Sequence, residues 1–588
     1  MHQRPVEHAE GERADVIGSG RVNLFGWRGR VLAGILALAA LVLFSIANRG
    51  AYKSYFQADS IDNLSLMQAL GARDFIRPLL VPKVFFNNLR PVGMLFFKLM
   101  GQWFGLWFQP YVAVLQLLHI LNAVLVVWLL QRLKESFAAA CSGALFFAVH
   151  MALFSVHWEP MYVFDLLCGS LCLLSVIAYI DGRWIVSFLL FWLAYRAKEI
   201  AVMLPVILAA YELLLGGRRW KRLTPFLALA LVLGVQASIN NAARQSDYTL
   251  HFDLASIWQC LTFYSGQIFL VPYAGYVILA LPWLVRDRRF WFGVACFCAL
   301  LVPMLLLPGR LANAYLYVPL TGLAISVGVL AQRQPKAVIA ALLLVWIPWN
   351  FVNLRRLRNT EVARGNTARV YVANVIKAAE RFPSIDTYIY HDLPMSWYVI
   401  PAVVRLVHHK SEDVKALRVE DGATLAALQS PSLVLLDWEP TPLPGSVVTL
   451  AHTPETPDLS FIKLDRSTPL WQLERGFDLG DRGPYRWMGP SAVARLSRPA
   501  GAKHFELTVN ATDALFKYVP RSHLRVLIDG RVIGERDFDH EAVEVLRWNL
   551  DPAPSGTARV DFEVQPGFRV DPQGELFGLN IGGFGFVP

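Results

Sequence analysis

Charged side chains are scarce in this sequence. Asp, Glu, Lys and Arg together make up 17% of its 588 residues, whereas a soluble domain carries about 25%. The scarcity is uneven, because residues 31–352 contain repeated apolar runs of 17–25 residues and residues 355–588 contain none. Runs of that length cross a bilayer as helices. An ordinary soluble protein is therefore excluded, and we expect a polytopic membrane protein with a water-soluble C-terminal region.

Cysteine is absent after residue 298. All six cysteines precede residue 299 and lie in or beside apolar runs, so disulfides and cysteine metal sites are excluded from the C-terminal region. The sequence also lacks a basic stripe with interleaved aromatic residues. The formal net charge of +10 therefore does not indicate a nucleic-acid partner. Many of the Lys and Arg residues lie instead in short loops between apolar runs.

The apolar runs predict a mainly α-helical bundle, a transmembrane domain over residues 31–355. A polar tail, residues 1–30, precedes the first run, and no small-residue cleavage site follows it, so we interpret that run as a retained span and not as a signal peptide. About eleven spans are predicted, at 31–48, 111–131, 137–154, 161–180, 184–196, 200–215, 224–240, 262–285, 290–307, 313–331 and 337–353.

The short loops indicate how the spans are oriented. With the N-terminus in the cytoplasm, every short inside loop is basic, including 218–222 and 286–289, as the positive-inside rule requires. An odd number of spans then places the large loop 49–110 and the C-terminal region outside. We expect a multi-pass protein of a bacterial inner membrane whose C-terminal region is periplasmic or extracellular.

The pattern changes after the last apolar run. Residues 356–467 mix a helical stretch, Val370–Arg381, with short strand-like runs such as Leu433–Asp437, which predicts an α/β segment. Farther on, alternating runs are divided by turn signals such as Asp529-Gly530, which predicts a β-sandwich over residues 468–588.

Two carboxylates, Asp59 and Asp62, stand three residues apart in the first outer loop. On a helix this spacing puts both on one face. A carboxylate at the membrane–water boundary can take the proton from an acceptor hydroxyl during attack, so either is a candidate general base. The alternative is a solvated loop acid or a helix cap, and the spacing alone does not decide between them.

Asp165 stands near the outer end of the predicted span 161–180. An ionisable group inside a span usually faces a partner or a wet cavity, although a boundary acid can also reach water or cap its helix. His150, His157 and Glu159 approach from the same side and are candidates for a pocket. Their spacing matches no zinc-ligand pattern, so the sequence identifies no metal site.

Three cations belong to the same predicted face. Lys198 lies between the fifth and sixth spans, Arg90 precedes a proline, and Arg310 precedes the tenth span. Singly, each fits a contact with lipid head groups or a role in topology. Together they form a basic ring on the face that holds the acids, a combination suited to an anionic lipid substrate.

Six motifs occur in a fixed order over about residues 30–355, and this order resembles the GT-C superfamily of membrane glycosyltransferases. The likeness is greatest to the protein O-mannosyltransferase branch and its relatives with tetratricopeptide tails. The motifs are Phe56–Asp62, Leu89–Val92, Leu117–Ala123, Ala144–His150 leading to Asp165–Leu167, Ala197–Glu199, and Ala314–Pro319.

The resemblance implies transfer of a sugar from a polyprenyl-phosphate carrier to an acceptor hydroxyl on the outer face of the membrane. Attack opposite the leaving phosphate inverts the anomeric carbon. The acceptor is a protein or a cell-envelope glycan, and a divalent metal such as Mg or Mn is a candidate cofactor. The implied base is Asp59, with Asp62 or Asp165 orienting the acceptor or metal.

The implied phosphate ligands are Lys198, Arg90 and Arg310, and Tyr315 and Tyr317 of the last motif join the pocket. Some positions depart from the family pattern. The family's two adjacent loop acids correspond here to Asp59 and Ser60, the proline after the span-three histidine is Met151, and the tail shows no tetratricopeptide repeats.

A second class of function also fits a polytopic chain with an outer domain, namely a transporter, flippase or scaffold. Transporters often have inverted repeats and spans broken near the membrane midplane. The sequence shows no clear internal symmetry, and its ionisable groups gather at the outer ends of spans. This distribution favours chemistry at the surface over passage through the middle.

Overall fold

The computed structural model describes residues 38, 40–81, 90–242, 249–280, 285–408, 413–571 and 573–588. The chain divides into two compact units, Met1–Arg49 and Gly50–Pro588. In the first unit, residues 40–48 are helical, and residues 31–37 and 39 of the predicted first span lie outside the described residues. The elements that follow all belong to the second unit.

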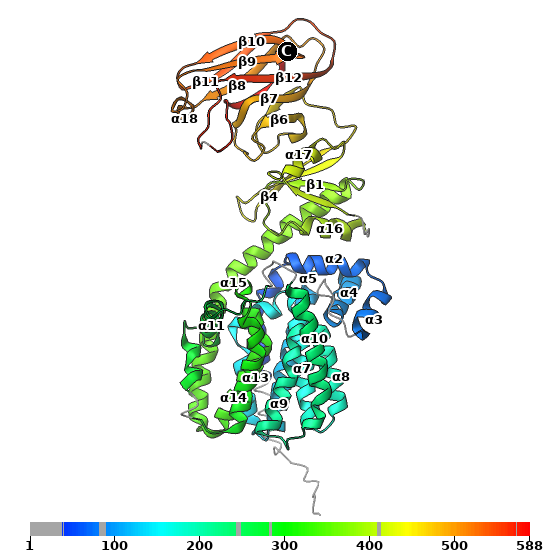
Figure 1. Cartoon of the computed structure of the whole chain (residues 1–588), viewed down its shortest axis with the longest axis vertical. Helices are drawn as coiled ribbons and strands as arrows, with labels where there is room; N and C mark the ends of the chain where they lie inside the picture. The colour runs from blue at the N-terminus through cyan, green and yellow to red at the C-terminus, as the bar shows by residue number, and fades with distance from the viewer. Residues whose placement is uncertain are drawn as a thin grey trace, which may run out of the picture. The chain divides into compact units, whose positions relative to one another are not determined.

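Long apolar helices form a bundle (Figure 1). Among the described residues, five helices are long and apolar enough to cross a membrane. The number is six if the pair α6 (Phe137–Ala148) and η2 (Met151–His157), which is bent by 71°, forms one span. The chain is thus an integral membrane protein. The total of eleven spans stays a prediction. The five helices are α5 (Phe108–Arg132), α7 (Val163–Ile180, led in by η3, Pro160–Tyr162), α13 (Arg288–Leu305), α14 (Tyr317–Arg333, led in by η8, Asn313–Leu316) and α15 (Lys336–Arg381).

Shorter apolar helices occupy three other predicted spans, at α8 (Trp184–Ala197), α9 (Leu204–Leu214, after η4, Glu199–Met203) and α10 (Thr224–Ala242). The predicted span 262–285 is wrong as one continuous helix. Instead α11 (Leu254–Ile268) ends there, and a 3₁₀ helix, η6 (Ala274–Ala280), follows. Pro272 between them lacks an amide hydrogen, and both Leu270 and Tyr273 have positive φ angles, which a continuous α-helix does not permit.

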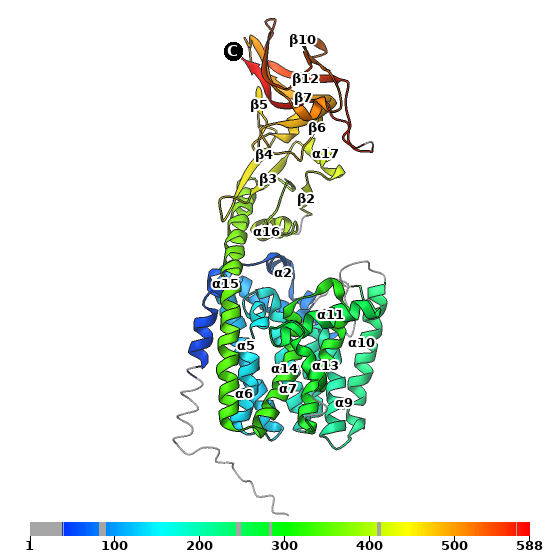
Figure 2. The ribbon, with the colours of Figure 1, turned by 90° about the vertical axis from the view of Figure 1, so that its left-hand side faces the viewer.

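α15 does not end at the predicted boundary near residue 355. It continues to Arg381 and includes the helical stretch predicted separately for the soluble region (Figure 2). No proline interrupts residues 349–381. The one glycine there, Gly365, lies against a 3₁₀ turn, η1 (Ala51–Lys53), and the residue after it: a Cβ at Gly365 would meet the Oγ of Ser54 at 2.4 Å. The glycine therefore permits a close approach without ending the helix.

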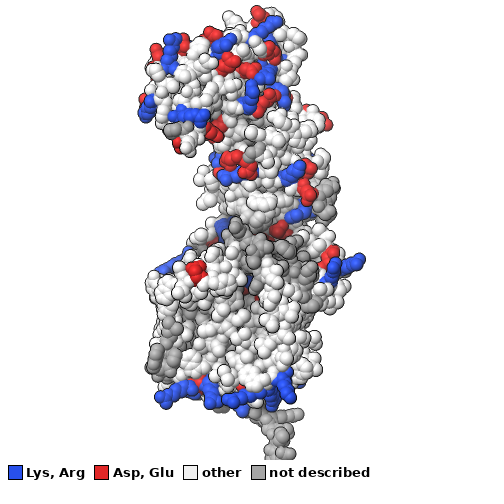
Figure 3. Space-filling view, viewed as in Figure 1, with Lys and Arg blue, Asp and Glu red and all other residues white. Residues whose placement is uncertain are grey.

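Small residues let the membrane helices pack closely. A Cβ at Gly322 of α14 would meet the carbonyl oxygen of Gly293 in α13 at 2.7 Å, which is the kind of contact that joins helices in a bilayer. On the face that Figure 3 shows, the middle of the bundle carries almost no charge, and Lys and Arg gather at one end. We call this the basic end. The opposite end carries α2 (Ala58–Ala69), α3 (Ala72–Leu80) and α4 (Pro91–Phe104), and we call it the α2 end.

Beyond α15 the chain forms a four-stranded sheet in the order β2-β1-β3-β4. β1 runs parallel to β2 and β3, whereas β3 and β4 are antiparallel. The parallel strands are joined by α16 (Val399–His408) and α17 (Gly422–Leu428), and α16 packs on α2. The region thus mixes helix and strand as predicted. Its strands are β1 (Thr387–Tyr390), β2 (Lys415–Arg418), β3 (Leu433–Glu439) and β4 (Ser446–His452).

The rest of the chain is β-rich. Strand β8 alternates buried and part-buried residues, and Phe505, Leu507 and Val509 enter a shared apolar core. Asp529 and Gly530 both have positive φ, the conformation of a tight hairpin turn, and join β9 to β10. The sandwich and the domain boundaries stay predictions. The strands are β5 (Phe461–Lys463), β6 (Leu473–Phe477), β7 (Arg486–Arg498), β8 (His504–Ala511), β9 (Ser522–Ile528), β10 (Arg531–Phe538), β11 (Ala542–Asn549), β12 (Gly556–Gln565) and β13 (Asn580–Val587), with sheet order β10-β9-β12-β7-β13-β8-β11, to which β5 adds on β13 and β6 on β7.

Candidate functional site at the α2 end

Two of the predicted residues meet directly. Asp165 lies in the first turn of α7, and Lys198 directly follows α8, the neighbouring helix. The lysine Nζ is 2.6 and 2.7 Å from the two carboxylate oxygens, and the side chains of Lys198 and Asp165 are only 10% and 4% exposed. Each charge compensates the other in a place where a lone charge would be costly.

A second ion pair lies beside the first. Arg90, the residue before α4, directs its Nε at 2.9 Å and its Nη2 at 2.8 Å toward the carboxylate of Glu199. Burial alone would raise the pKa of Glu199, but the charge and hydrogen bonds of Arg90 outweigh it and hold that pKa below its usual value. The Arg90 guanidinium also lies 5.3 Å from the ring centroid of Phe164. Because Glu199 adjoins Lys198 and Phe164 adjoins Asp165, the two pairs form one cluster.

The charges of this four-residue cluster cancel. A phosphate entering it would therefore be held by directed donors and not by a net positive field. Lys198 has three ammonium hydrogens for the two oxygens of Asp165, and its Nζ also lies 4.9 Å from the ring centroid of Tyr315. Among the described residues, the Nη1 of Arg90 has no hydrogen-bond partner. Donors on both cations thus remain for an anion.

A buried polar network lies on the membrane side of the cluster. Tyr317 donates to His119 Nδ1 at 3.0 Å, and the other nitrogen of that ring is 3.0 Å from the Ala148 carbonyl oxygen. Asn122 donates to Tyr317 Oη and to the carbonyl oxygen of Leu166, both at 2.9 Å. His157 stacks on His119 with ring centroids 4.7 Å apart. Tyr317 therefore joins α14 to α5, Asn122 joins α5 to α7, and His157 of η2 packs on α5.

His150 also has a structural partner. Its Nε2 lies 2.9 Å from the carbonyl oxygen of Ile268, and its Nδ1 accepts from the amide of Ala152, so the ring fastens the start of η2 to the end of α11.

Met151 stands where the pattern that this sequence resembles has a proline, and its backbone contact explains the difference. Met151 donates its amide to Asn350 Oδ1 at 2.7 Å, a hydrogen bond that a proline at this position could not form.

The predicted acids of the outer loop lie on one helix and face one partner. α2 presents both carboxylates to the α16 segment, as their spacing predicts. Tyr398 donates to Asp59, and Arg405 lies 3.1 Å from Asp62 Oδ1 and 3.2 Å from Ser65 Oγ. Burial raises the pKa of Asp62, and the charge of Arg405 opposes this effect. The pKa of Tyr398 is raised to about 12 by burial and by Asp59, so the phenol remains a donor.

Glu159 lies directly before η3, in the loop that leads into α7. Within the described part of the chain, no donor or cation forms a hydrogen bond or ion pair with its carboxylate, and burial raises its pKa to about 7. Its loop touches α2, because the amide of Met161 donates to Ser60 Oγ at 3.1 Å.

Arg310 lies in a 3₁₀ turn, η7 (Pro308–Arg310), in the segment that leads to Tyr315. The described contacts do not place it on the Asp165–Lys198 cluster. In the part of the chain that the structure covers, no three His, Cys, Asp or Glu side chains are grouped as metal ligands. Mg or Mn as a cofactor stays untested.

Some members of the site were not identified from the sequence. Glu199, Tyr398 and Arg405 supply the partners of Arg90, Asp59 and Asp62. Glu199 stands in the motif Ala197–Glu199, so its charge beside Lys198 was a usable signal. Tyr398 and Arg405 carry no such signal, because they lie more than 330 positions from their partners in the chain.

Comparison with known proteins gives a likeness of fold alone. No protein-family profile and no curated protein matches the chain. Two solved structures of ArnT from Cupriavidus metallidurans are similar. The apo structure has a TM-score of 0.46 and 13% identity over 72% of this chain and 98% of that one. The structure bound to undecaprenyl phosphate has a TM-score of 0.44 and 14% identity over 71% and 94%. Neither protein is named as an O-mannosyltransferase, so that branch stays a prediction.

Proposed function

We propose that this chain is a GT-C-type membrane glycosyltransferase that moves a sugar, a hexose by expectation, from a polyprenyl-phosphate carrier to an acceptor hydroxyl. The observation that supports this best is the cluster of Arg90, Glu199, Lys198 and Asp165 beside the acids of α2. Cations that bind phosphate and carboxylates that take protons occur together at one end of a membrane bundle. A lipid-linked sugar requires a site at that level, because its carrier stays in the bilayer.

The cations serve the leaving group. The acceptor oxygen forms a bond to the anomeric carbon, the bond from that carbon to the phosphate oxygen breaks, and its electron pair stays on the phosphate. Arg90 Nη1 and the Lys198 ammonium offer donors for this developing charge, and Arg310 is the third candidate. A divalent metal would supply the same stabilisation.

A carboxylate takes the acceptor proton. Asp59 is the proposed base, because its helix faces the water-soluble region from which an acceptor would arrive. Asp62 pairs with Arg405, and this ion pair orients the face of α2 that also carries Asp59. Glu159 is the second candidate base, because a pKa of about 7 is close to the operating pH at which general bases are most effective. The pH profile of the reaction rate distinguishes the two candidate bases, since Glu159, with a pKa of about 7, ionises in the pH range in which the enzyme is assayed.

The proposed orientation follows from charge. The basic end faces the cytoplasm, and the α2 end with residues 356–588 faces the periplasm or exterior of a bacterium. The α/β segment, 356–467, then contacts the acids of α2 through the α16 segment. The β-rich region, 468–588, is the region that would bind a protein or cell-envelope glycan acceptor.

The test is donor turnover by the purified full-length protein with a panel of polyprenyl-phosphate sugars, followed by release of free polyprenyl phosphate. Undecaprenyl phosphate, the lipid in one ArnT structure, serves as the product-binding probe. We expect turnover of at least one donor. We also expect Lys198→Ala to weaken binding of the probe more than Lys198→Arg does, because arginine keeps the charge.

Arg222, in a short turn at the basic end, provides the matched control, and Arg222→Ala should leave probe binding unchanged. Failure to turn over every donor in the panel, together with probe binding that is insensitive to Lys198, would overturn the proposal. Vectorial movement of lipid without cleavage would favour a flippase or transporter instead.

A further inference from the structure

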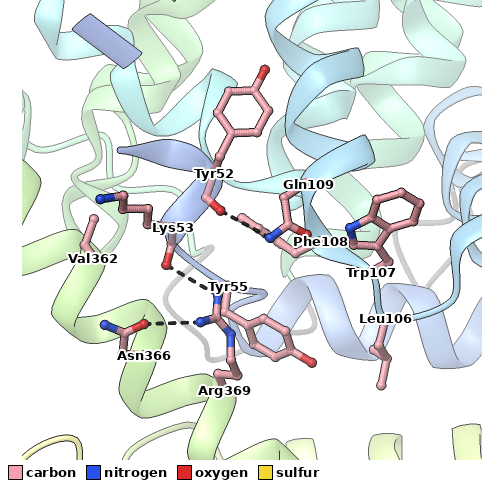
Figure 4. A pocket seen from close by; sticks show the side chains of 10 residues that line it. All are labelled: Tyr52, Lys53, Tyr55, Leu106, Trp107, Phe108, Gln109, Val362, Asn366 and Arg369. Atoms are coloured by element: carbon pink, nitrogen blue, oxygen red, sulfur yellow. Dashed lines mark hydrogen bonds between the residues drawn. The ribbon is translucent and has the colours of Figure 1, made fainter. Parts of the chain in front are cut away.

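A pocket at the α2 end lies apart from the four-residue cluster. It has a volume of about 490 Å³, a size typical of small-ligand sites. Three segments form it: η1 and the residues just after it, the turn that leads into α5, and the middle of α15. We call it the η1–α15 pocket (Figure 4). It is lined by Tyr52, Lys53, Tyr55, Leu106, Trp107, Phe108, Gln109, Val362, Asn366 and Arg369.

The pocket carries two positive charges and no acid. Among the described residues, the Lys53 ammonium forms no ion pair, and Arg369 reaches only neutral acceptors. Its Nη2 is 2.7 Å from the carbonyl oxygen of Ser54, and its Nη1 is 3.4 Å from Asn366 Oδ1. These bonds hold the guanidinium in place without cancelling its charge. The contrast with the paired cations of the cluster is what indicates an anionic ligand here.

Aromatic rings complete the lining. Arg369 lies 5.3 Å from the ring centroid of Tyr55, which fixes the cation over a flat surface. Trp107, just before α5 begins, is 60% exposed, and exposed tryptophans at the ends of spans are typical of the head-group level of a membrane. The pocket therefore combines a charged wall with an apolar entrance beside a span.

We infer that the η1–α15 pocket binds the phosphate-bearing head group of an anionic lipid. Lys53 and Arg369 meet the phosphate, Gln109 and Asn366 offer amides to the head-group hydroxyls, and Trp107 lies along the upper part of the acyl chains. The volume exceeds that of phosphate alone and leaves room for a glycerol or sugar head group. This inference does not rest on sugar transfer, because it uses none of the residues assigned to the base or to the carrier phosphate.

Binding is measured by thermophoresis on the full-length protein in a neutral detergent. The probes are dihexanoyl phosphatidylglycerol, dihexanoyl phosphatidylcholine of equal chain length, and glycerol 3-phosphate. We expect the phosphatidylglycerol to bind, with the other two about tenfold weaker or more, because one lacks net charge and the other lacks chains. The Kd for phosphatidylglycerol should rise with salt.

The variants are Lys53→Gln and Lys53→Gln/Arg369→Gln. Each lost cation should raise the Kd about tenfold. Lys53→Gln guards against misfolding, because the Lys53 ammonium forms no hydrogen bond or ion pair with any residue that the structure describes. Arg355→Gln is the matched control: this arginine is exposed on the same helix outside the pocket, and its loss should leave the Kd unchanged.

Three outcomes would overturn the inference. An unchanged Kd in Lys53→Gln and in the double variant shows that lipid binds elsewhere. Equal binding of phosphatidylcholine shows that charge does not select the ligand. Equal binding of glycerol 3-phosphate shows that the pocket takes a free phosphate ester and not a lipid.

Discussion

Replacing Lys198 by methionine should destabilise this protein far more than removing an exposed charge. The substitution keeps an unbranched side chain of similar length, so the main loss is the ammonium. Asp165 then keeps a carboxylate that is 4% exposed with no cation at 2.6–2.7 Å. Leaving one member of a buried pair unpaired costs about 3–5 kcal/mol. An unfolding entropy of about 2.1 cal/mol/K per residue over 588 residues corresponds to about 0.8 °C for each kcal/mol, so Tm should fall by about 2–4 °C.

A double variant separates this effect from simple loss of packing. In Asp165→Asn/Lys198→Met neither position keeps a charge, so most of the lost stability should return, because buried pairs contribute little beyond an apolar replacement. The assay is thermal unfolding in detergent, followed by intrinsic fluorescence, for the wild type, both single variants and the double variant. A double-mutant cycle gives the interaction free energy.

Arg132 and Asp181 provide the control. They form a 3.2 Å ion pair at the basic end, with the arginine side chain 44% exposed, and Arg132→Met should cost less than about 1 kcal/mol. If Lys198→Met costs no more than Arg132→Met, or if the effects of the two single variants simply add in the double variant, then Asp165 and Lys198 do not compensate each other's buried charge.

Further predictions concern the proposed chemistry and orientation. Asp59→Asn should lower kcat about 100- to 10,000-fold with little change in donor Kd, and full turnover would count against this base. If Glu159 is the base, its raised pKa keeps it protonated at low pH, so kcat/KM should rise about tenfold between pH 6 and 8 as the carboxyl ionises near pH 7. Glu159→Gln should then abolish activity. An active Glu159→Gln variant with the same rise of kcat/KM with pH would exclude Glu159 as the base. Tyr398→Phe should lower kcat less than Asp59→Asn does, because it removes a single hydrogen bond to the carboxylate; an unchanged rate means that α16 does not position the acid. Reporter fusions at residues 220 and 400 should report opposite compartments, and the same compartment for both would refute the orientation.

The sequence by itself determined the membrane class of the protein and much of its local structure. Apolar runs of bilayer length and alternating β patterns are local signals, so α5, α7 and strands such as β3 lie where periodicity predicts them. The spacing of Asp59 and Asp62 likewise predicted a shared helix face, because three residues make nearly one turn. Asp165 stands out in the sequence because an ionisable group inside a span is costly and usually faces a partner or a wet cavity, and Lys198 stands out as a cation able to contact a phosphate.

Only the tertiary structure decided which charges meet. The partners in this site are far apart in the chain: Asp165 from Lys198 by 33 positions, Arg90 from Glu199 by 109, and Asp59 from Tyr398 by 339. Local pattern carries no information about such pairings, because they depend on how whole helices pack. The same reason explains why α15 passes through a predicted domain boundary. Polarity changes there, but nothing in the backbone stops the helix, and Gly365 lets η1 pack against it.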